Sequence, residues 1–195
     1  MKRLFDILVS ITALVIFLPF GLVISLLIAF GSRGGIFYIQ ERIGRNSVPF
    51  GLYKFRTMKK DADKHGKLTV GMRDSRITKI GYFLRRYKLD EFPQFINVLK
   101  GEMSVVGPRP EVKEYVDLYT SDQREILDVK PGITDYASLE FFKENEILGA
   151  SENPQKTYIE EVMPVKIELN RKYLANPTVL HDIKIMWKTF RKIIS

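Results

Sequence analysis

Two adjacent carboxylates, Asp90 and Glu91, begin an apolar stretch in the segment KLDEFPQ (88–94). An ionised aspartate can attack phosphorus as a nucleophile. A neighbouring carboxylate can hold Mg²⁺, a hard cation that prefers oxygen ligands and substrate phosphates. The partial positive charge of a helix N-terminus would keep such a carboxylate ionised. The pair is equally compatible with a structural role, in which Asp90 caps a helix and Glu91 faces solvent.

The elements around this pair are predicted to be helices. Asp90 as N-cap, Pro93 in the first turn and Gly101 just past the end are typical helix boundaries. Another helix is expected over 77–87, where it carries Arg85. Because arginine matches phosphate oxygens in a bidentate manner, this neighbourhood suits a phosphorylated ligand.

Short strands are expected near 36–58, where aromatic and β-branched residues are frequent. Lys54 and Arg56 stand two apart, so in a strand their side chains share one face. That face is either part of a binding site or a solvated surface. The overall class predicted is α+β, mostly helical.

An uncharged apolar run extends from Ile7 to Phe30. As a single helix it would be roughly 36 Å long, and a bilayer core is about 30 Å thick. Pro19, in its middle, removes a backbone hydrogen bond and clashes with the preceding turn. Basic residues flank both ends of the run, and the positive-inside tendency would place both ends in the cytoplasm. A re-entrant helix broken at Pro19 explains all of these observations, and a kinked single span is the alternative.

The positive charge of the chain is concentrated beside this apolar run. The net charge is +8, and residues 1–60 hold nine basic and two acidic residues. Basic residues next to an apolar segment suit a protein on an anionic membrane surface rather than a nucleic-acid binder. The chain has no cysteine and two histidines, which excludes thiolate chemistry and argues against a zinc site built on several histidines.

The C-terminal segment 180–194 predicts a basic amphipathic helix. Its apolar residues recur at 3-4-3-4 spacing, and they are Leu180, Ile183, Trp187, Phe190 and Ile194. Such a helix lies either at a lipid interface or against the protein core. Together with the apolar run, it predicts a membrane-embedded segment over 1–33 and a catalytic domain over 34–195 with interfacial amphipathic helices. A helix with a break or a kink at Pro164 is expected over 154–175.

Four segments occur in a fixed order that resembles the bacterial sugar transferase family. They are YKFRTM (53–58), LDEFPQFINVLKG (89–101), MSVVGPRP (103–110) and KPGIT (130–134). The segments KRLFD (2–6) and QERIG (40–44) are similar to the family as well. The family comprises monotopic polyprenyl-phosphate phosphoglycosyl transferases, and the length of this chain resembles the minimal catalytic form.

The resemblance implies a two-step transfer of a phosphosugar from a UDP-sugar to polyprenyl phosphate, expected to be undecaprenyl phosphate. Asp90 matches the nucleophile, which would form a covalent aspartyl-phosphosugar as UMP leaves. Glu91, with Asp90 beside it, matches the Mg²⁺ site. Arg85 and Arg109 match phosphate-binding arginines.

The remaining implied features concern the setting of the reaction. Lys54 and Arg56 are expected active-site cations. The reaction is expected at the cytoplasmic face of the bacterial inner membrane, in contact with membrane lipid and without nucleic acid, as the first membrane step of glycoconjugate synthesis. A catalytically inactive membrane adaptor is the alternative, and the intact Asp90–Glu91 pair and Arg109 speak against it.

The chain departs from the family pattern in two places that matter for the site. Thr134 is followed by Asp135, where many members have glycine. The stretch 139–154 is longer and more acidic than in the smallest members, and it is expected to shape the sugar pocket. The identity of the sugar, the glycan pathway and the oligomeric state therefore do not follow from the sequence.

Overall fold

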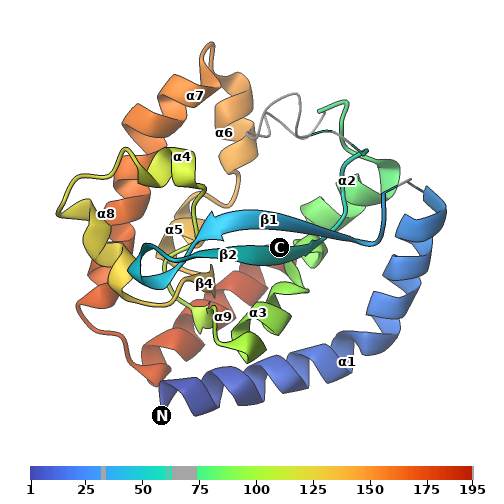
Figure 1. Cartoon of the computed structure of the whole chain (residues 1–195), viewed down its shortest axis with the longest axis horizontal. Helices are drawn as coiled ribbons and strands as arrows, with labels where there is room; N and C mark the ends of the chain where they lie inside the picture. Colours follow the sequence, from blue (N-terminus) through green and yellow to red (C-terminus); the bar gives the residue numbers. More distant parts are fainter. Residues whose placement is uncertain (32–33, 61, 63–73, 195) are drawn as a thin grey trace.

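The computed structural model describes residues 1–31, 34–60, 62 and 74–194 (Figure 1). The domain boundary predicted at residue 33 lies outside them. These residues form a mostly helical fold with two small sheets, which confirms the predicted class. Among them, a single helix, α1 (Lys2–Gly31), is long and apolar enough to cross a membrane.

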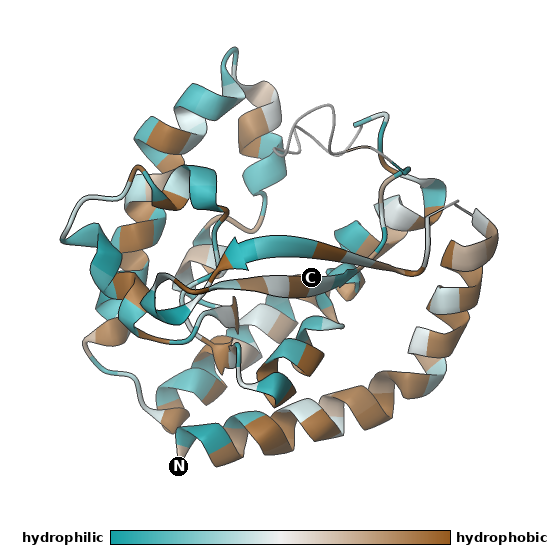
Figure 2. Cartoon of the chain, viewed as in Figure 1, coloured by the Kyte–Doolittle hydropathy of each residue, from teal (hydrophilic) through white to brown (hydrophobic). Residues whose placement is uncertain are grey.

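Helix α1 is continuous, so the predicted break at Pro19 is wrong. Pro19 lies inside the helix, and Figure 1 shows that α1 bends midway along its length. A proline removes one backbone hydrogen bond and crowds the preceding turn, which bends a helix without ending it when the other bonds of the ladder persist. Most residues of α1 are apolar (Figure 2), and only 11% of its most apolar stretch is buried.

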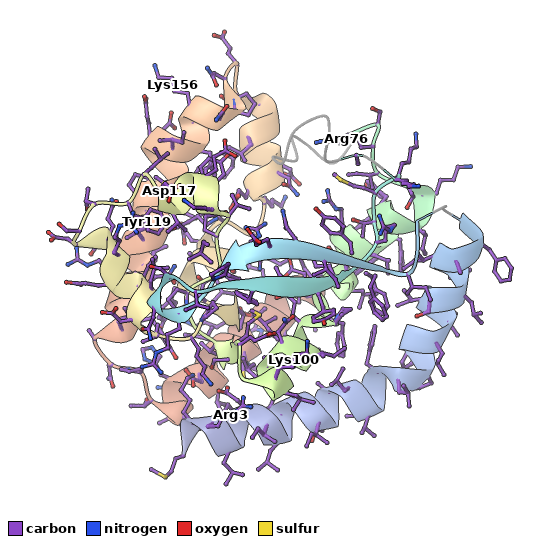
Figure 3. The ribbon with its side chains drawn as sticks, in the orientation of Figure 1. Arg3, Arg76, Lys100, Asp117, Tyr119 and Lys156 are labelled. Carbon is purple, nitrogen blue, oxygen red and sulfur yellow. The ribbon has the colours of Figure 1, made fainter. Side chains whose placement is uncertain are left out.

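The first turns of α1 are fixed to the globular body by charged and polar side chains. Lys2 Nζ lies 2.5 Å from Asp182 Oδ2. Arg3, labelled in Figure 3, donates to the backbone carbonyls of Val98 and Leu99 at the end of the helix α3 (Gln94–Lys100). The buried Asp6 accepts hydrogen bonds from Ser104 Oγ and the Val105 amide.

The second half of α1 packs against the same globular body through apolar contacts. Ile24 and Ile28 are buried in a cluster with Phe55 and Leu84. The rings of Phe17 and Phe92 stack with centroids 3.6 Å apart. Both ends of α1 are therefore held by one body, with an exposed apolar face between them.

Two strands lie in the region where short strands were expected, and they pair as a hairpin. Strands β1 (Phe37–Ile43) and β2 (Pro49–Phe55) pair antiparallel, with Phe37 opposite Phe55 and Ile43 opposite Pro49. The sequence analysis did not predict a second pair, in which β3 (Ser104–Val106) runs parallel to β4 (Gly132–Thr134).

Glycine is required where the second pair of strands meets. A Cβ atom on Gly107 would lie 2.6 Å from the Lys130 carbonyl oxygen, and one on Gly132 would lie 2.1 Å from the Gly107 amide nitrogen. No other residue fits at so close an approach of two backbones. The motifs GPRP and KPGIT, which lie apart in the sequence, therefore pack directly against each other through their backbones.

The remaining helices surround the hairpin and the second pair of strands. They are α2 (Lys79–Arg86), α4 (Lys113–Val116), α5 (Tyr136–Glu140), α6 (Glu144–Ala150), α7 (Pro154–Thr157), α8 (Met163–Leu174) and α9 (Val179–Ile194). The helical run does not break at Pro164, which was one of the two predicted alternatives, because a π-helical turn (Tyr158–Val162) joins α7 to α8 and Pro164 lies in the first turn of α8. A proline is accommodated there because the π-helical turn shifts the hydrogen-bond ladder directly before the residue that has no amide proton to donate.

Helix α9 turns its predicted apolar stripe outward. Leu180, Trp187 and Phe190 are 65%, 60% and 53% exposed, whereas Asp182 and Ile185 on the opposite face are buried. Core packing of the stripe is therefore excluded, which leaves the interfacial alternative.

Candidate functional site

The Asp90–Glu91 pair lies in a 3-10 turn (Leu89–Glu91) between α2 and α3. Lys88 precedes it with a left-handed backbone, φ 55°, which reverses the chain sharply after α2. The N-cap residue of α3 is Pro93, so the prediction that Asp90 caps this helix is wrong. Asp90 is only 6% exposed, and two pockets meet at it.

The two pockets differ in character. A polar pocket of about 220 Å³ extends over β1 and the start of α6. A more apolar pocket of about 390 Å³ extends between α3 and α9. The residues that line both are Lys54, Arg85, Asp90, Arg109, Glu144, Asn145 and Lys166. Two carboxylates, Asp90 and Glu144, and four cations thus occupy the junction between the polar and the apolar pocket.

Glu91 is held by two of the predicted cations. Arg109 donates from both terminal nitrogens to the two carboxylate oxygens, with Nη1 3.0 Å from Oε2. Lys54 Nζ lies 3.6 Å from Glu91 Oε1. This geometry aligns both cations beside the neighbouring Asp90.

Asp135 sets the position of Arg109, a role that the sequence analysis missed. Its side chain is fully buried and accepts from the Arg109 amide at 3.1 Å and from the Ser138 amide at 2.6 Å, the latter as N-cap of α5. The departure from glycine after Thr134 was the available signal, because an aspartate before a helix is a typical cap.

The two carboxylates have opposite pKa shifts. Burial and the neighbouring negative charge of Glu91 raise the pKa of Asp90 above its usual range. Burial opposes ionisation of Glu91 too, but the charges of Arg109 and Lys54 outweigh it and hold the pKa of Glu91 well below its usual range. Two carboxylates with separated pKa values are typical of active sites, because each then has a different role.

Burial also acts on the cations. It lowers the pKa of Lys54 to about 8, against the opposing effect of Glu91. It lowers the pKa of Arg85, whose Nε donates to Thr57 Oγ1 at 3.1 Å. The pKa of Lys54 is therefore closer to neutral pH than that of an exposed lysine.

Arg56 is placed differently from Lys54. Both residues line the polar pocket, as their shared face predicts. The Arg56 guanidinium, however, donates to the Gly35 and Phe37 carbonyls at 3.0 and 3.1 Å, beyond the end of β2 at Phe55. Arg56 fixes the start of the hairpin, and Lys54 is the member of the pair that reaches the carboxylates.

A chain of buried and half-buried polar groups forms one wall of the polar pocket. Arg42 donates to Glu111 at 2.9 Å and to Gln40, and Glu111 accepts from the Tyr158 hydroxyl. The sequence analysis gave these residues no role. The alternation of β1, which places Gln40 and Arg42 on one face, was the available signal.

The carboxylate pair suits Mg²⁺. Magnesium is usually bound by one or two carboxylates together with substrate phosphates and water, and Asp90 and Glu91 supply the two carboxylates. Within the described ranges no group of three or more acidic, histidine or cysteine side chains forms a closed metal cage. Because Arg109 already contacts both Glu91 oxygens, a metal would share that carboxylate with the arginine.

The fold and this site define a protein with a long, exposed apolar helix and a group of cations around a buried carboxylate. A family model described as bacterial sugar transferase matches residues 1–195. The chain belongs to the bacterial sugar transferase family, as its motifs predicted.

Curated relatives act on different sugars. A UDP-N-acetylgalactosamine-undecaprenyl-phosphate N-acetylgalactosaminephosphotransferase of Aeromonas hydrophila is 35% identical over 100% of this chain and 44% of its own length. A UDP-glucose:undecaprenyl-phosphate glucose-1-phosphate transferase of Escherichia coli is 34% identical over 98% of this chain and 40% of its own. A putative undecaprenyl-phosphate N-acetylgalactosaminyl 1-phosphate transferase of Bacillus subtilis is 45% identical over 68% of this chain and 70% of its own. The chain thus spans less than half of two of these relatives.

Proposed function

We propose that this chain transfers a sugar 1-phosphate from a UDP-sugar to undecaprenyl phosphate, releasing UMP. The observation that supports this most directly is the buried Asp90 at the junction of a polar and an apolar pocket, among Lys54, Arg85 and Arg109. The names of these relatives agree in the acceptor, and they give N-acetylgalactosamine as the sugar in two cases and glucose in the third.

The proposed chemistry has two displacements at one phosphorus. An Asp90 oxygen attacks the β-phosphorus of the UDP-sugar, an O–P bond forms, and the bond to the bridging oxygen breaks as UMP leaves with the electron pair. An oxygen of the lipid phosphate then attacks the same phosphorus and releases the Asp90 carboxylate. The raised pKa of Asp90 makes its carboxylate, once ionised, a stronger nucleophile than an exposed aspartate.

The cations have a defined electrostatic role in this scheme. Both substrates and the nucleophile are anionic, so the attack meets charge repulsion unless preorganised positive groups surround the phosphorus. Lys54, Arg85 and Arg109 provide such groups, and Asp135 fixes the backbone of Arg109. Mg²⁺ held by Glu91 and Asp90 would add charge neutralisation on the phosphate oxygens.

The reaction is tested by UMP release from purified protein with Mg²⁺, undecaprenyl phosphate and a panel of UDP-sugars. Release with one donor, dependent on the acceptor and on Mg²⁺, supports the proposal and identifies the sugar. Absence of release with every donor of the panel would favour the inactive-adaptor alternative.

The pH profile should show the low pKa of Lys54. We expect kcat/KM for the UDP-sugar to fall as the pH rises through about 8, because Lys54 then loses the charge that attracts phosphate. Lys54→Arg should move this fall to higher pH, since a guanidinium stays protonated. An unchanged alkaline limb in the variant would contradict the assignment.

For the membrane arrangement we propose that α1 enters the bilayer from the cytoplasmic face and returns to it. Support comes from the contacts at both of its ends, Lys2 and Arg3 at one and Ile24 and Ile28 at the other, with a single globular body. A span that crosses the bilayer would place those two ends on opposite sides. The outward stripe of α9 would lie at the same interface.

Thiol labelling tests this arrangement without background, because the chain has no cysteine. We expect Leu4→Cys and Phe37→Cys, exposed positions near the two ends of α1, to react with an impermeant maleimide in inverted vesicles alone. Phe20→Cys, exposed in the middle of α1, should be protected from both sides. Labelling of the two ends from opposite sides would establish a span instead.

A further inference from the structure

The apolar pocket, of about 390 Å³, has a lining that the phosphotransfer chemistry itself does not require. Apart from the residues that it shares with the polar pocket, its walls are mainly apolar. The apolar residues there are Phe92, Phe95, Val105, Ile133, Phe141, Phe142, Met186, Phe190 and Ile193. Phosphates and sugars are poorly matched to such walls, whereas a hydrocarbon chain gains by leaving water for them.

The apolar walls continue into the outer surface of α9. Phe190 lines the pocket and is also 53% exposed within the outward stripe of that helix. The rings of Phe190 and Trp187 stack with centroids 6.0 Å apart, which joins the pocket wall to the stripe. An apolar path therefore leads from the lipid-facing surface of α9 to the cations around Asp90.

The edge of the pocket carries positive charge. Lys88 and Lys192, from two different elements, both place their ammonium groups over the ring of Phe142, at 5.5 and 5.8 Å from its centroid. Lys192 also donates to the Leu139 carbonyl, which ties α9 to the start of the 139–154 stretch. Basic side chains on an apolar rim favour an anionic amphiphile over a neutral one.

We propose that this pocket, between α3, the α5–α6 connection and α9, binds the first isoprene units of the acceptor lipid, with the lipid phosphate at Asp90. The inference rests on the proposed function and adds to it the route of the lipid chain. The UDP-sugar would then enter by the polar pocket, so that donor and acceptor approach the same phosphorus from two chambers.

Photocrosslinking tests the route independently of turnover. An isoprenyl phosphate with a diazirine on its second isoprene unit would be irradiated with the full chain in nanodiscs, and the labelled peptides identified by mass spectrometry. We expect label on 92–95 and 186–193, reduced by excess undecaprenyl phosphate. Label confined to α1, or label that undecaprenyl phosphate does not reduce, would overturn the proposal.

A chain-length comparison tests it kinetically. We expect Phe190→Ser to lower kcat/KM for undecaprenyl phosphate about tenfold relative to a one-isoprene phosphate, because some of the apolar wall is lost. The KM for the UDP-sugar should stay unchanged. Ile183→Ser is the matched control, since Ile183 belongs to the same exposed stripe but does not line the pocket.

The crosslinking and chain-length experiments distinguish failure of the lipid pocket from failure of the proposed transferase function. An equal loss of chain-length preference in both variants, or none in either, would overturn the route while leaving the transferase activity in place. Wild-type protein that is crosslinked on 92–95 and 186–193 but releases no UMP would support the lipid pocket and contradict the proposed reaction.

Discussion

Asp90→Asn is expected to lower the rate of UMP release by about 10⁴-fold or more, the scale seen when a covalent nucleophile is removed. The amide has nearly the same shape but cannot form the bond to phosphorus. Folding should persist, because Asp90 is buried with a raised pKa and a neutral side chain suits that place. The measurement is UMP release under saturating donor and acceptor, beside a thermal unfolding curve.

A second measurement distinguishes a nucleophile from a merely electrostatic carboxylate. Wild-type protein given UDP-sugar alone, then quenched in acid, should gain the mass of one phosphosugar, and Asp90→Asn should not. Asp117→Asn is the matched control, since this carboxylate is exposed on the protein surface and pairs only with Lys113 among the described residues (Figure 3). An adduct of the same mass on Asp90→Asn would place the nucleophile elsewhere.

The sequence predicted the elements that residue composition over a short stretch determines. The aromatic and β-branched stretches gave the β1–β2 hairpin, and the uncharged run gave α1. The β3–β4 pair was missed because each strand has three residues, which is too short for an alternating pattern, and its partner lies more than twenty residues away. The close approach of Gly107 and Gly132 is a tertiary contact, which the sequence of neither turn predicts by itself.

The sequence predicted which residues gather at the site, but not the contacts among them. Lys54, Arg85, Asp90, Glu91 and Arg109 do come together, from a hairpin, a helix end, a 3-10 turn and a proline-flanked loop. Their order in the sequence says nothing of which side chain contacts which. The guanidinium of Arg56 binds carbonyls rather than the carboxylates because β2 ends one residue before it.

The sequence is least informative about residues that hold the site residues in place through hydrogen bonds. Asp135 accepts a hydrogen bond from the backbone amide of Arg109. Glu111 accepts hydrogen bonds from Arg42 and from the Tyr158 hydroxyl in the wall of the polar pocket. A single buried acid has no distinctive spacing, so its role becomes visible only when the partners from distant segments are placed around it.

Arg109→Gln is expected to reduce kcat/KM by about 10²- to 10³-fold, comparable to the loss of one preorganised donor to a transition-state oxyanion. It should also lower the free energy of unfolding by about 2–4 kcal/mol, because it leaves the Glu91 carboxylate without its bidentate partner in a largely buried place. Both effects are measured on the same detergent-solubilised sample, by UMP release and by chemical denaturation.

A double-mutant cycle with Glu91→Gln separates the two effects. The double variant has no unpaired Glu91 carboxylate, and Lys54, which then lacks that partner, can lose its proton because burial already lowers its pKa to about 8. The double variant should therefore regain most of the stability that Arg109→Gln loses. It should regain none of the activity, because the positive charge near the phosphorus is still absent. A double variant as unstable as Arg109→Gln would show that Arg109 stabilises the fold through its other contacts. Recovered activity would show that its charge serves only to neutralise Glu91.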